Sequence, residues 1–191
     1  MVSRNIFASA GELQLVESLL NTRYGQRSRL HDVWPDRAAM EDWLRDQQLI
    51  GTDTVVTEGD FRRATALRES LRRLLRTGDA GTPAEEAVAT VSNMATHLLL
   101  RVQVLSGTEA RLEPESAGVD GFLARVLAEM YTAMATGVWT RLKICRNMAC
   151  SRAFYDKSRN HSGVWCSSAR CGNRMHARTY RQQRKSSPNR L

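Results

Sequence analysis

The stretch that decides the fold runs from Cys145 to Cys171, CRNMACSRAFYDKSRNHSGVWCSSARC, and contains all four cysteines of the 191-residue chain. Their spacing is Cys145-x4-Cys150-x15-Cys166-x4-Cys171, two short pairs separated by a span long enough for a β-hairpin. Structural zinc sites follow this plan, because each pair supplies two corners of a tetrahedron. Clustered thiols also favour metal over disulfides in a reducing compartment. We therefore expect the four thiolates to bind one Zn²⁺ ion.

The same cysteines leave three other interpretations open. His161 or His176 could replace one cysteine as a ligand, the thiols could form a redox disulfide relay, or they could hold an iron–sulfur cluster. The four-cysteine zinc site ranks first, because the pairs need no further ligand and the basic surroundings favour zinc. Such a site leaves no coordination position for water or substrate, so the zinc should be structural. We accordingly predict that the protein is not an enzyme.

Basic residues are concentrated around and beyond the cysteines. Residues 139–191 contain 13 Lys and Arg and the single acidic residue Asp156, a formal net charge of +12. The rest of the chain carries −4, which brings the total to +8. This asymmetry indicates a polyanionic partner. Of the 28 basic residues 25 are Arg, whose planar guanidinium suits contacts to phosphates and bases.

The residues after Cys166 are predicted to form one helix over 168–185, because serines can cap it and it contains no Pro and one Gly. At about 100° per residue, five cations would share an arc of roughly 80°. These cations are Arg170, Arg174, Arg178, Arg181 and Lys185. Cys171, Met175 and Thr179 would lie on the other side of the helix, facing the metal and a small core. The helix is thus expected to present cations on one face and to hold zinc with the other.

We expect the cationic face to contact nucleic acid. A cation near a helix N-terminus is unfavourable unless an anion binds there too, and Arg170 and Arg174 lie at that end. These two are candidates for base contacts if the helix enters the major groove N-terminus first, and the later cations would follow the phosphates. The predicted nucleic-acid-binding residues are Arg170, Asn173, Arg174, Arg178, Arg181, Arg184 and Lys185. The alternative is a solvated basic helix end.

The first 138 residues are predicted to be mostly helical. The expected helix starts are a capping box at 9–12, Pro35 in a first turn, Thr57 with Asp60, and Thr82–Pro83, with Gly78 ending the third helix. The apolar stripes to be buried are Leu13, Val16, Leu19 and Leu20, then Ala39, Met40, Trp43 and Leu44, then Phe61, Ala64, Leu67, Leu71 and Leu74. These stripes would supply the core of the N-terminal domain.

After the fourth helix the hydrophobic period changes from 3.6 to 2. Leu100, Val102 and Val104 alternate with polar residues, which predicts a half-buried strand, and a turn at 106–108 leads to a return strand that Pro114 closes. A long helix follows, with an apolar face. That face is Val119, Phe122, Val126, Met130 and Met134. We place the domain boundary at Gly137, giving domains 1–138 and 139–191.

With these residues in hand, a family resemblance is evident. The segments 139–145, 150–156 and 158–160, Trp165-Cys166 and Cys171-Gly172-Asn173-Arg174 closely resemble the CGNR zinc-finger family of bacterial proteins. The N-terminal part is similar to the ABATE domain of that family, with echoes at Asn21-Thr22, Trp43-Leu44 and 67–72. The resemblance covers essentially the whole chain.

The resemblance implies a stress-induced transcription regulator, with an α+β N-terminal domain and a zinc finger similar to treble clefs. One departure is Met148-Ala149, where many members carry a proline, and we expect a less rigid knuckle there. For the signature residues we expect Gly172 to permit a tight turn and Asn173 to bond local backbone. Arg174 would reach a phosphate or guanine edge, or else pin the hairpin loop through Asp156.

We therefore predict an α+β protein: a mostly helical N-terminal domain with a small β-hairpin, followed by a treble-clef-like zinc finger. It would bind double-stranded DNA and regulate transcription, with a small-molecule effector at the N-terminal domain and a homodimer as further expectations. RNA binding on Phe154, Tyr155, Trp165 and Tyr180, or an acidic protein partner, are the alternatives.

Three smaller expectations complete the prediction. Asn21-Thr22 could line a ligand pocket, although a cap that ends the helix is the favoured role. His31 and His97 stand alone and are expected to be structural. The chain has no apolar run of membrane-spanning length and its first ten residues have no sustained apolar region, so we expect no membrane association and a cytoplasmic location.

Overall fold

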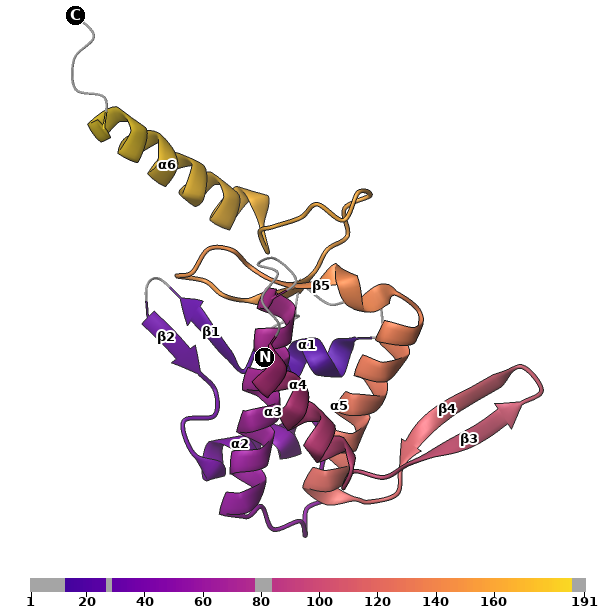
Figure 1. The fold of residues 1–191 in the computed structure, drawn as a ribbon. Helices are drawn as coiled ribbons and strands as arrows, with labels where there is room; N and C mark the ends of the chain where they lie inside the picture. Colours follow the sequence, from indigo (N-terminus) through magenta and orange to yellow (C-terminus); the bar gives the residue numbers. More distant parts are fainter. Residues whose placement is uncertain (1–12, 27–28, 78–83, 187–191) are drawn as a thin grey trace, which may run out of the picture.

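The computed structural model describes residues 13–26, 29–77 and 84–186, in a mostly helical α+β arrangement as predicted. Helices α1 to α5 form the body of the protein (Figure 1). Three two-stranded antiparallel hairpins are attached to it, and helix α6 projects away from it. Within the described ranges no helix is long and apolar enough to cross a membrane.

Helix α1 (Gln14–Leu20) lies at the centre of the body. It packs against both α3 (Glu58–Thr77) and α5 (Gly118–Ala135), and its predicted apolar residues are fully buried. The N-terminal end of α1 is capped from α5, because the backbone N–H groups of Leu15 and Val16 donate to the carboxylate of Glu129 at 3.0 and 3.1 Å. Burial raises the pKa of Glu129, against the effect of these two hydrogen bonds. The capping box predicted at 9–12 lies outside the described residues.

The remaining helix starts agree with the sequence except at one proline. Helix α2 (Arg37–Asp46) begins after Asp36, whose carboxylate accepts the N–H of Ala39 at 2.9 Å, so Pro35 precedes the cap and is not in the first turn as predicted. Helix α3 starts at the predicted capping box: the Thr57 hydroxyl accepts the Asp60 N–H, and the Asp60 carboxylate accepts the Thr57 N–H. Helix α4 (Glu85–Ala95) follows. The signals at Thr82–Pro83 and Gly78 lie outside the described residues.

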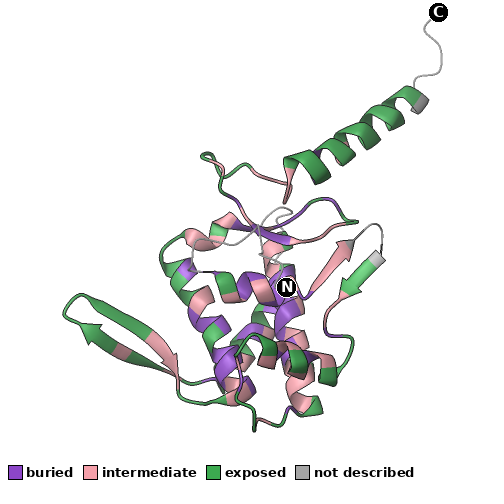
Figure 2. Ribbon diagram, turned by 180° about the vertical axis from the view of Figure 1, so that it is seen from behind, coloured by how far each residue is buried: buried purple, intermediate pink, exposed green. Residues whose placement is uncertain are grey.

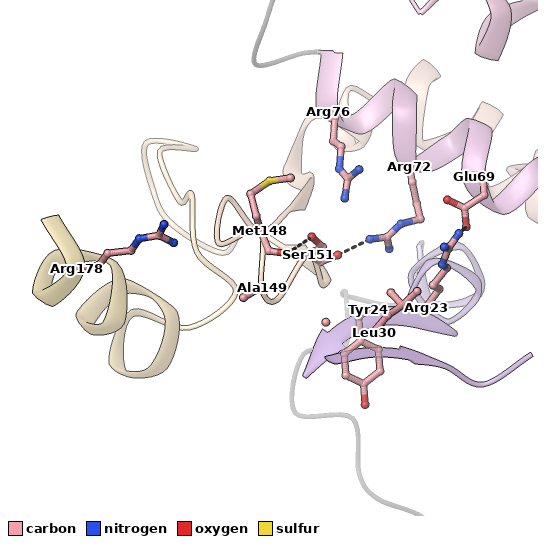
Figure 3. A pocket seen from close by; sticks show the side chains of 11 residues that line it. Arg23, Tyr24, Leu30, Glu69, Arg72, Arg76, Met148, Ala149, Ser151 and Arg178 are labelled. Atoms are coloured by element: carbon pink, nitrogen blue, oxygen red, sulfur yellow. Dashed lines mark hydrogen bonds and ion pairs between the residues drawn. The ribbon is translucent and has the colours of Figure 1, made fainter. Parts of the chain in front are cut away.

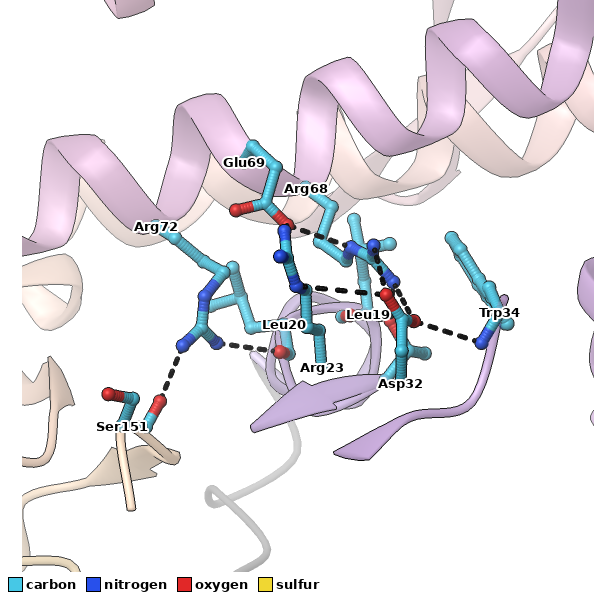
Figure 4. A network of polar contacts seen from close by, with 10 residues as sticks. Leu19, Leu20, Arg23, Asp32, Trp34, Arg68, Glu69, Arg72 and Ser151 are labelled. Atoms are coloured by element: carbon cyan, nitrogen blue, oxygen red, sulfur yellow. Dashed lines mark hydrogen bonds and ion pairs between the residues drawn. The ribbon is translucent and has the colours of Figure 1, made fainter. Parts of the chain in front are cut away.

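A buried arginine joins α3 to the hairpin of β1 (Arg23–Gln26) and β2 (Arg29–Asp32) (Figure 4). Arg68 is 1% exposed and donates to both carboxylate oxygens of Asp32, at 3.0 and 3.3 Å. It also donates to the hydroxyl of Thr22 at 2.9 Å, and its guanidinium lies 5.3 Å from the centre of the Trp34 ring. The backbone N–H of Trp34 bonds the same Asp32. This network could not be predicted from the sequence, because a charge inside an amphipathic helix gives no sign of its partner.

The hairpin of β3 (Leu100–Ser106) and β4 (Glu109–Pro114) forms where predicted, but its burial differs from the prediction. Val102 and Val104 are 67% and 72% exposed, and Leu105 is 44% exposed. The hairpin projects from the start of α5, and Figure 2 shows its outer part exposed and its base half-buried. Alternation predicts a strand, but a buried face also needs an element to cover it. The expectation of a half-buried strand is therefore wrong.

The core continues from the helical body into the cysteine-bearing segment. Helix α5 ends at Ala135, and Gly137, whose φ of 77° is left-handed, leads into the short helix η1 (Val138–Arg141). Of the predicted apolar face of α5, the first three residues are buried, whereas Met134 is 46% exposed. Beyond the turn, Leu142, Ile144 and Ala153 join the same buried cluster as α1, α3 and α5. The proposed domain boundary at 138/139 thus falls at a turn across which apolar packing is continuous.

The Arg68 network predicts a large cost for removing the side chain. Arg68→Ala would leave Asp32 without its main partner and lower the free energy of unfolding by about 3 kcal/mol. Arg62→Ala, on the exposed face of the same helix, is the matched control and should change it by less than about 0.5 kcal/mol. Urea denaturation followed by circular dichroism measures both. Equal stability of the two variants would contradict the structural role of Arg68.

Candidate metal centre and nucleic-acid interface

The four cysteine sulfurs converge at one point. Their Sγ atoms all lie within 4.8 Å of one another. The distance from Cys150 to Cys166 is 3.6 Å, and that from Cys166 to Cys171 is 3.8 Å. A tetrahedral zinc with Zn–S bonds of about 2.3 Å places its sulfurs about 3.8 Å apart. The arrangement therefore fits a four-thiolate zinc ion.

The pKa values of Cys145, Cys150 and Cys166 also favour the binding of a divalent cation. Hydrogen bonds from Cys145 and Cys166 lower the pKa of Cys150 to about 2. Hydrogen bonding with Cys145 and Cys150, burial and the charge on neighbouring thiolates raise the pKa of Cys166, while the hydrogen bond to Cys150 raises that of Cys145 to about 11. One thiolate thus opposes the ionisation of the next. A bound divalent cation offsets this repulsion, because thiolate ligands are deprotonated by the metal.

The strands that support the site lie around the first cysteine pair. Strand β5 (Leu142–Ile144) ends immediately before Cys145, and β6 (Ala153–Tyr155) starts three residues after Cys150. The two strands pair antiparallel, so the first cysteine pair lies on the turn that joins them. The hairpin expected between the two pairs is therefore misplaced: it encloses the first pair. This hairpin with its knuckle, followed by a helix that carries Cys171, is the treble-clef plan that the resemblance implied.

The turn between Cys145 and Cys150 is held by Asn147. Its backbone carbonyl accepts the N–H groups of Cys150 and Ser151 at 2.7 and 2.9 Å, and its side-chain oxygen accepts the N–H of Ala149 at 3.2 Å. Asn147 is 3% exposed, whereas Met148 next to it is 77% exposed. Asn147 therefore holds the backbone of this turn with three hydrogen bonds. We call the segment from Cys145 to Ala153, which carries the first cysteine pair, the knuckle.

Asp156 closes the loop that follows β6. Its carboxylate accepts Lys143 Nζ at 2.7 Å and the backbone N–H groups of Ser158 and Gly163 at 2.9 and 2.8 Å. Burial acts to raise the pKa of Asp156, but these hydrogen bonds outweigh burial and hold it well below its usual range. Among the described contacts of Asp156 there is none with Arg174, so pinning of this loop by Arg174 is not observed.

The helical body holds the knuckle by its backbone. The side-chain amide of Asn21 donates to the carbonyl of Ala153 at 3.0 Å and accepts its N–H at 2.9 Å. The N–H of Gly25 donates to the carbonyl of Cys150 at 2.5 Å, and Arg72 donates to the carbonyl of Ser151 at 2.5 Å. Asn21 is also the C-cap of α1, the favoured expectation for it. The family echo at Asn21 thus marks an anchor for the zinc module.

The segment after Cys166 is helical in two parts. Ser168–Gly172 forms a single π-helical turn, capped by the Ser167 hydroxyl, which accepts the N–H of Arg170 at 3.2 Å. Regular helix α6 covers Asn173–Ser186. Cys171 and Gly172 are buried and Met175 is half-buried, but Thr179 is exposed. The expected metal-facing side of the helix therefore extends no further than Met175, and Figures 1 and 2 show the rest projecting away from the body.

The signature residues after Cys171 have different surroundings. A Cβ on Gly172 would lie 3.2 Å from Cδ1 of Trp165, so the glycine permits a close approach of the helix to that ring. Its role is close packing, since its backbone is not left-handed as a tight turn would require. Asn173 and Arg174 are exposed, and no hydrogen bond from the Asn173 side chain to local backbone is found among the described contacts.

The predicted cations whose side chains are described are exposed, but the π-helical turn separates Arg170 from the others. Arg170 lies in the π-helical turn, so the arc worked out for a continuous α-helix does not extend to it. From Arg174 onward the helix is regular, and Arg174, Arg178 and Arg181 lie within roughly 60° of one another. The Arg184 guanidinium lies 5.9 Å from the centre of the Tyr180 ring. The Lys185 side chain lies outside the described residues.

The histidines and aromatic residues of the alternative interpretations do not form a metal site or a base-stacking surface. His161 and His176 are exposed. In the described part of the chain, the candidate metal cluster consists of the four cysteines and includes neither histidine. Phe154 is 5% exposed and packs with Cys145 and Cys171. Trp165 and Tyr155 are half-buried, and Tyr180 is 60% exposed. An aromatic platform for single-stranded RNA is therefore not assembled by these four rings.

The architecture defines a class: a helical body that carries a treble-clef-like zinc finger and an exposed basic helix. Residues 13–137 match the ABATE family, described as "Putative stress-induced transcription regulator", and residues 141–184 match the CGNR zinc finger. The chain belongs to the ABATE family and carries a CGNR zinc finger, and its cofactor is a structural zinc ion. Neither family is described as one of enzymes. A comparison with curated proteins finds no match.

The ligand set can be tested by zinc content. The zinc-loaded protein should contain one Zn²⁺ per chain, and Cys145→Ser or Cys171→Ser should lose it, because three thiolates hold zinc far less tightly than four. His161→Ala and His176→Ala are the matched controls and should retain one zinc. Plasma emission spectroscopy after dialysis against a chelator measures the metal. Loss of zinc from either histidine variant would overturn the four-cysteine assignment.

The close contact of β1 with the knuckle gives a second test. A Cβ on Gly25 would lie 2.3 Å from the carbonyl oxygen of Ala149, so Gly25→Ala must displace the knuckle backbone. We expect this to lower the free energy of unfolding of the zinc-loaded protein by about 2 kcal/mol. Gly107→Ala, where an added Cβ meets nothing within 4 Å, is the control. Denaturant unfolding of both variants checks the prediction, which fails if the two are equally stable.

Proposed function

We propose that this protein is a transcription regulator that binds double-stranded DNA with α6. The observation that carries the proposal is the exposed helix itself, which extends from the zinc centre with four described arginines and no acidic residue. Its 14 residues make a rod about 21 Å long. A helix of this kind fits the major groove of B-DNA, which is about 12 Å wide.

The zinc module gives this helix a fixed starting point. Cys171 binds the metal centre in the last turn before α6, and the knuckle is held to the body by Asn21, Gly25 and Arg72. A helix whose base is held can enter a groove without first being ordered, which lowers the entropic cost of binding. The described part of α6 offers no acidic side chain to pair with its arginines. Phosphates supplied by DNA would offset their mutual repulsion.

We assign the contacts by their position along the helix. Arg170 and Arg174 lie at its N-terminal end, where they would reach base edges, and Arg178, Arg181 and Arg184 would contact phosphates. Asn173 begins α6 beside them and Lys185 follows at its far end. Contacts of the first kind give sequence preference, while those of the second give salt-dependent affinity.

The proposal includes four properties of the whole protein. It acts in the cytoplasm and has no catalytic activity, and it forms a homodimer, which would let two α6 helices read two half-sites. The exposed apolar side chains of the β3–β4 hairpin support a contact between copies. A small-molecule effector acts on the helical body.

Charge reversal tests the proposal directly. The triple variant Arg174→Glu, Arg178→Glu and Arg181→Glu should lose DNA binding by at least about a hundredfold, because three favourable phosphate or base contacts become repulsive. Its zinc content should stay at the wild-type level, since Cys171 and the knuckle are untouched. Fluorescence anisotropy with a duplex recovered by selection from a randomised library measures the affinity.

The control is a triple charge reversal elsewhere. Arg37→Glu, Arg62→Glu and Arg73→Glu change three exposed arginines of helices α2 and α3, and the net charge changes by the same amount. This variant should keep its DNA affinity within about threefold at near-physiological salt, where distant surface charges are screened. Unaltered affinity of the α6 variant would refute the proposal. Tighter binding to single-stranded RNA than to duplex DNA would favour an RNA-binding protein.

A further inference from the structure

A groove lies where the helical body, the knuckle and α6 meet (Figure 3). Its volume is about 560 Å³, within the usual range for small-molecule sites. Its walls come from β1, from the C-terminal half of α3, from the knuckle and from the middle of α6. None of the predicted nucleic-acid residues except Arg178 takes part in it. The groove thus joins parts of the chain that are far apart in sequence.

The groove contains an excess of positive charge. Four arginines line it, Arg23, Arg72, Arg76 and Arg178, against one carboxylate, that of Glu69. Glu69 lies 3.0 Å from Arg23 and 3.2 Å from Arg68, so its charge is already shared between two guanidinium groups. Three arginines therefore face the groove without an acidic partner among the described residues.

Arg72 shows that the charge excess extends into the protein. The side chain is almost fully buried, and its guanidinium donates to the carbonyl oxygens of Leu20 and Ser151 at 2.8 and 2.5 Å. Both partners are neutral. Burial, with the nearby positive charges of Arg76, Arg68 and Arg23, lowers the pKa of Arg72 to about 10. An anion beside it would relieve this unfavourable environment.

Arg76 and Arg178 approach the groove from opposite sides. Arg76 extends from α3 one turn beyond Arg72, and Arg178 points from α6 toward the exposed side chain of Met148, which lies between the two arginines in Figure 3. Each guanidinium presents a planar set of donors to a carboxylate or phosphate, so an anion that lies over Met148 would meet a cation on either side. No ion pair is found for either side chain among the described contacts.

The groove also has apolar walls and is hollow. Tyr24, Leu30, Met148 and Ala149 line it beside the arginines, and Leu30 and Met148 are 63% and 77% exposed. Apolar and aromatic walls with a few charged groups among them are typical of small-molecule sites. Arg72 lies beneath the surface, 4% exposed, where the backbone of a rigid duplex about 20 Å wide would not reach. These features favour a small ligand over the backbone of a duplex.

We propose that this groove binds a small organic anion, a carboxylate or phosphate on an apolar or aromatic body, and that its binding weakens the hold of α6 on DNA. The anion would lie between Arg76 and Arg178 with its apolar part against Met148 and Tyr24. Binding of the anion is independent of DNA binding, whereas its effect on the hold of α6 on DNA rests on the proposed function. Arg178 links the two, because a guanidinium paired with the ligand is withdrawn from a DNA phosphate, and such coupling is reciprocal.

Isothermal titration of the zinc-loaded full chain with phenyl phosphate and benzoate tests the site, with phenol as a neutral probe of the same shape. At constant ionic strength, at least one of the two anions should bind saturably, one per chain, and at least about tenfold more tightly than phenol. Arg76→Gln should weaken that binding by about tenfold, whereas Arg62→Gln, a matched change on the same helix, should leave it unchanged. Zinc content and circular dichroism of each variant report that the fold is retained.

Anisotropy with the selected duplex tests the coupling. A concentration of the bound anion that just saturates the wild-type protein should weaken its DNA binding several-fold at constant ionic strength, and should weaken that of Arg76→Gln by clearly less. Binding of neither anion, or equal binding by Arg76→Gln, overturns the proposed site. The proposed site is also overturned if neither anion binds the wild-type protein and Arg76→Gln loses DNA affinity. The groove would then receive a DNA phosphate. Saturable anion binding by a protein that binds no DNA would keep the site and reject the proposed function instead.

Discussion

The structure depends above all on the attachment of the knuckle to the helical body. Among the described residues, four hydrogen bonds make this attachment. The side-chain amide of Asn21 donates one and accepts one, and Gly25 and Arg72 donate one each. All four involve backbone atoms of the zinc module. The guanidinium of Arg152 adds to it from the other side, 4.0 Å from the centre of the Tyr24 ring. Zinc fixes the positions of the four sulfurs relative to one another. The attachment fixes the whole zinc centre relative to the core, and so sets the direction in which α6 leaves the protein.

Local signals in the sequence were enough for most of the helices, for the β3–β4 hairpin and for the metal site, but not for the β1–β2 hairpin. The Cys145–Cys171 spacing identified the zinc ligand set, the capping box at Thr57 located the start of α3, and alternation over 100–104 located a strand. The sequence could not show which backbone atoms Asn21 contacts, because its partner lies 132 residues away. The same holds for the exposed face of the β3–β4 hairpin. Alternation describes a strand, whereas burial depends on neighbours that are distant along the chain.

The basic helix shows the same division between local and long-range information. Its charge and its helical period could be predicted from the sequence, but the π-helical turn at Ser168–Gly172 could not. The wider spacing of that turn comes from the fit of Gly172 beside Trp165 and of Cys171 at the metal. The expectation that one whole face would pack on a core also failed, since nothing in the period states how far the core extends. The groove beneath α6 was equally hidden, because Arg76 and Arg178 lie 102 positions apart in the sequence.

The attachment of α6 at one end has a mechanical consequence. The helix is fixed at Cys171 and contacts the body little beyond Met175, so it behaves as a lever with its pivot at the zinc centre. A rotation of about 10° at the pivot displaces the far end of a 21 Å rod by roughly 4 Å, more than the length of a hydrogen bond. Changes of a fraction of an ångström in the knuckle are therefore amplified along the helix. The residues that hold the pivot, and not those along the rod, then determine how accurately its tip is aimed.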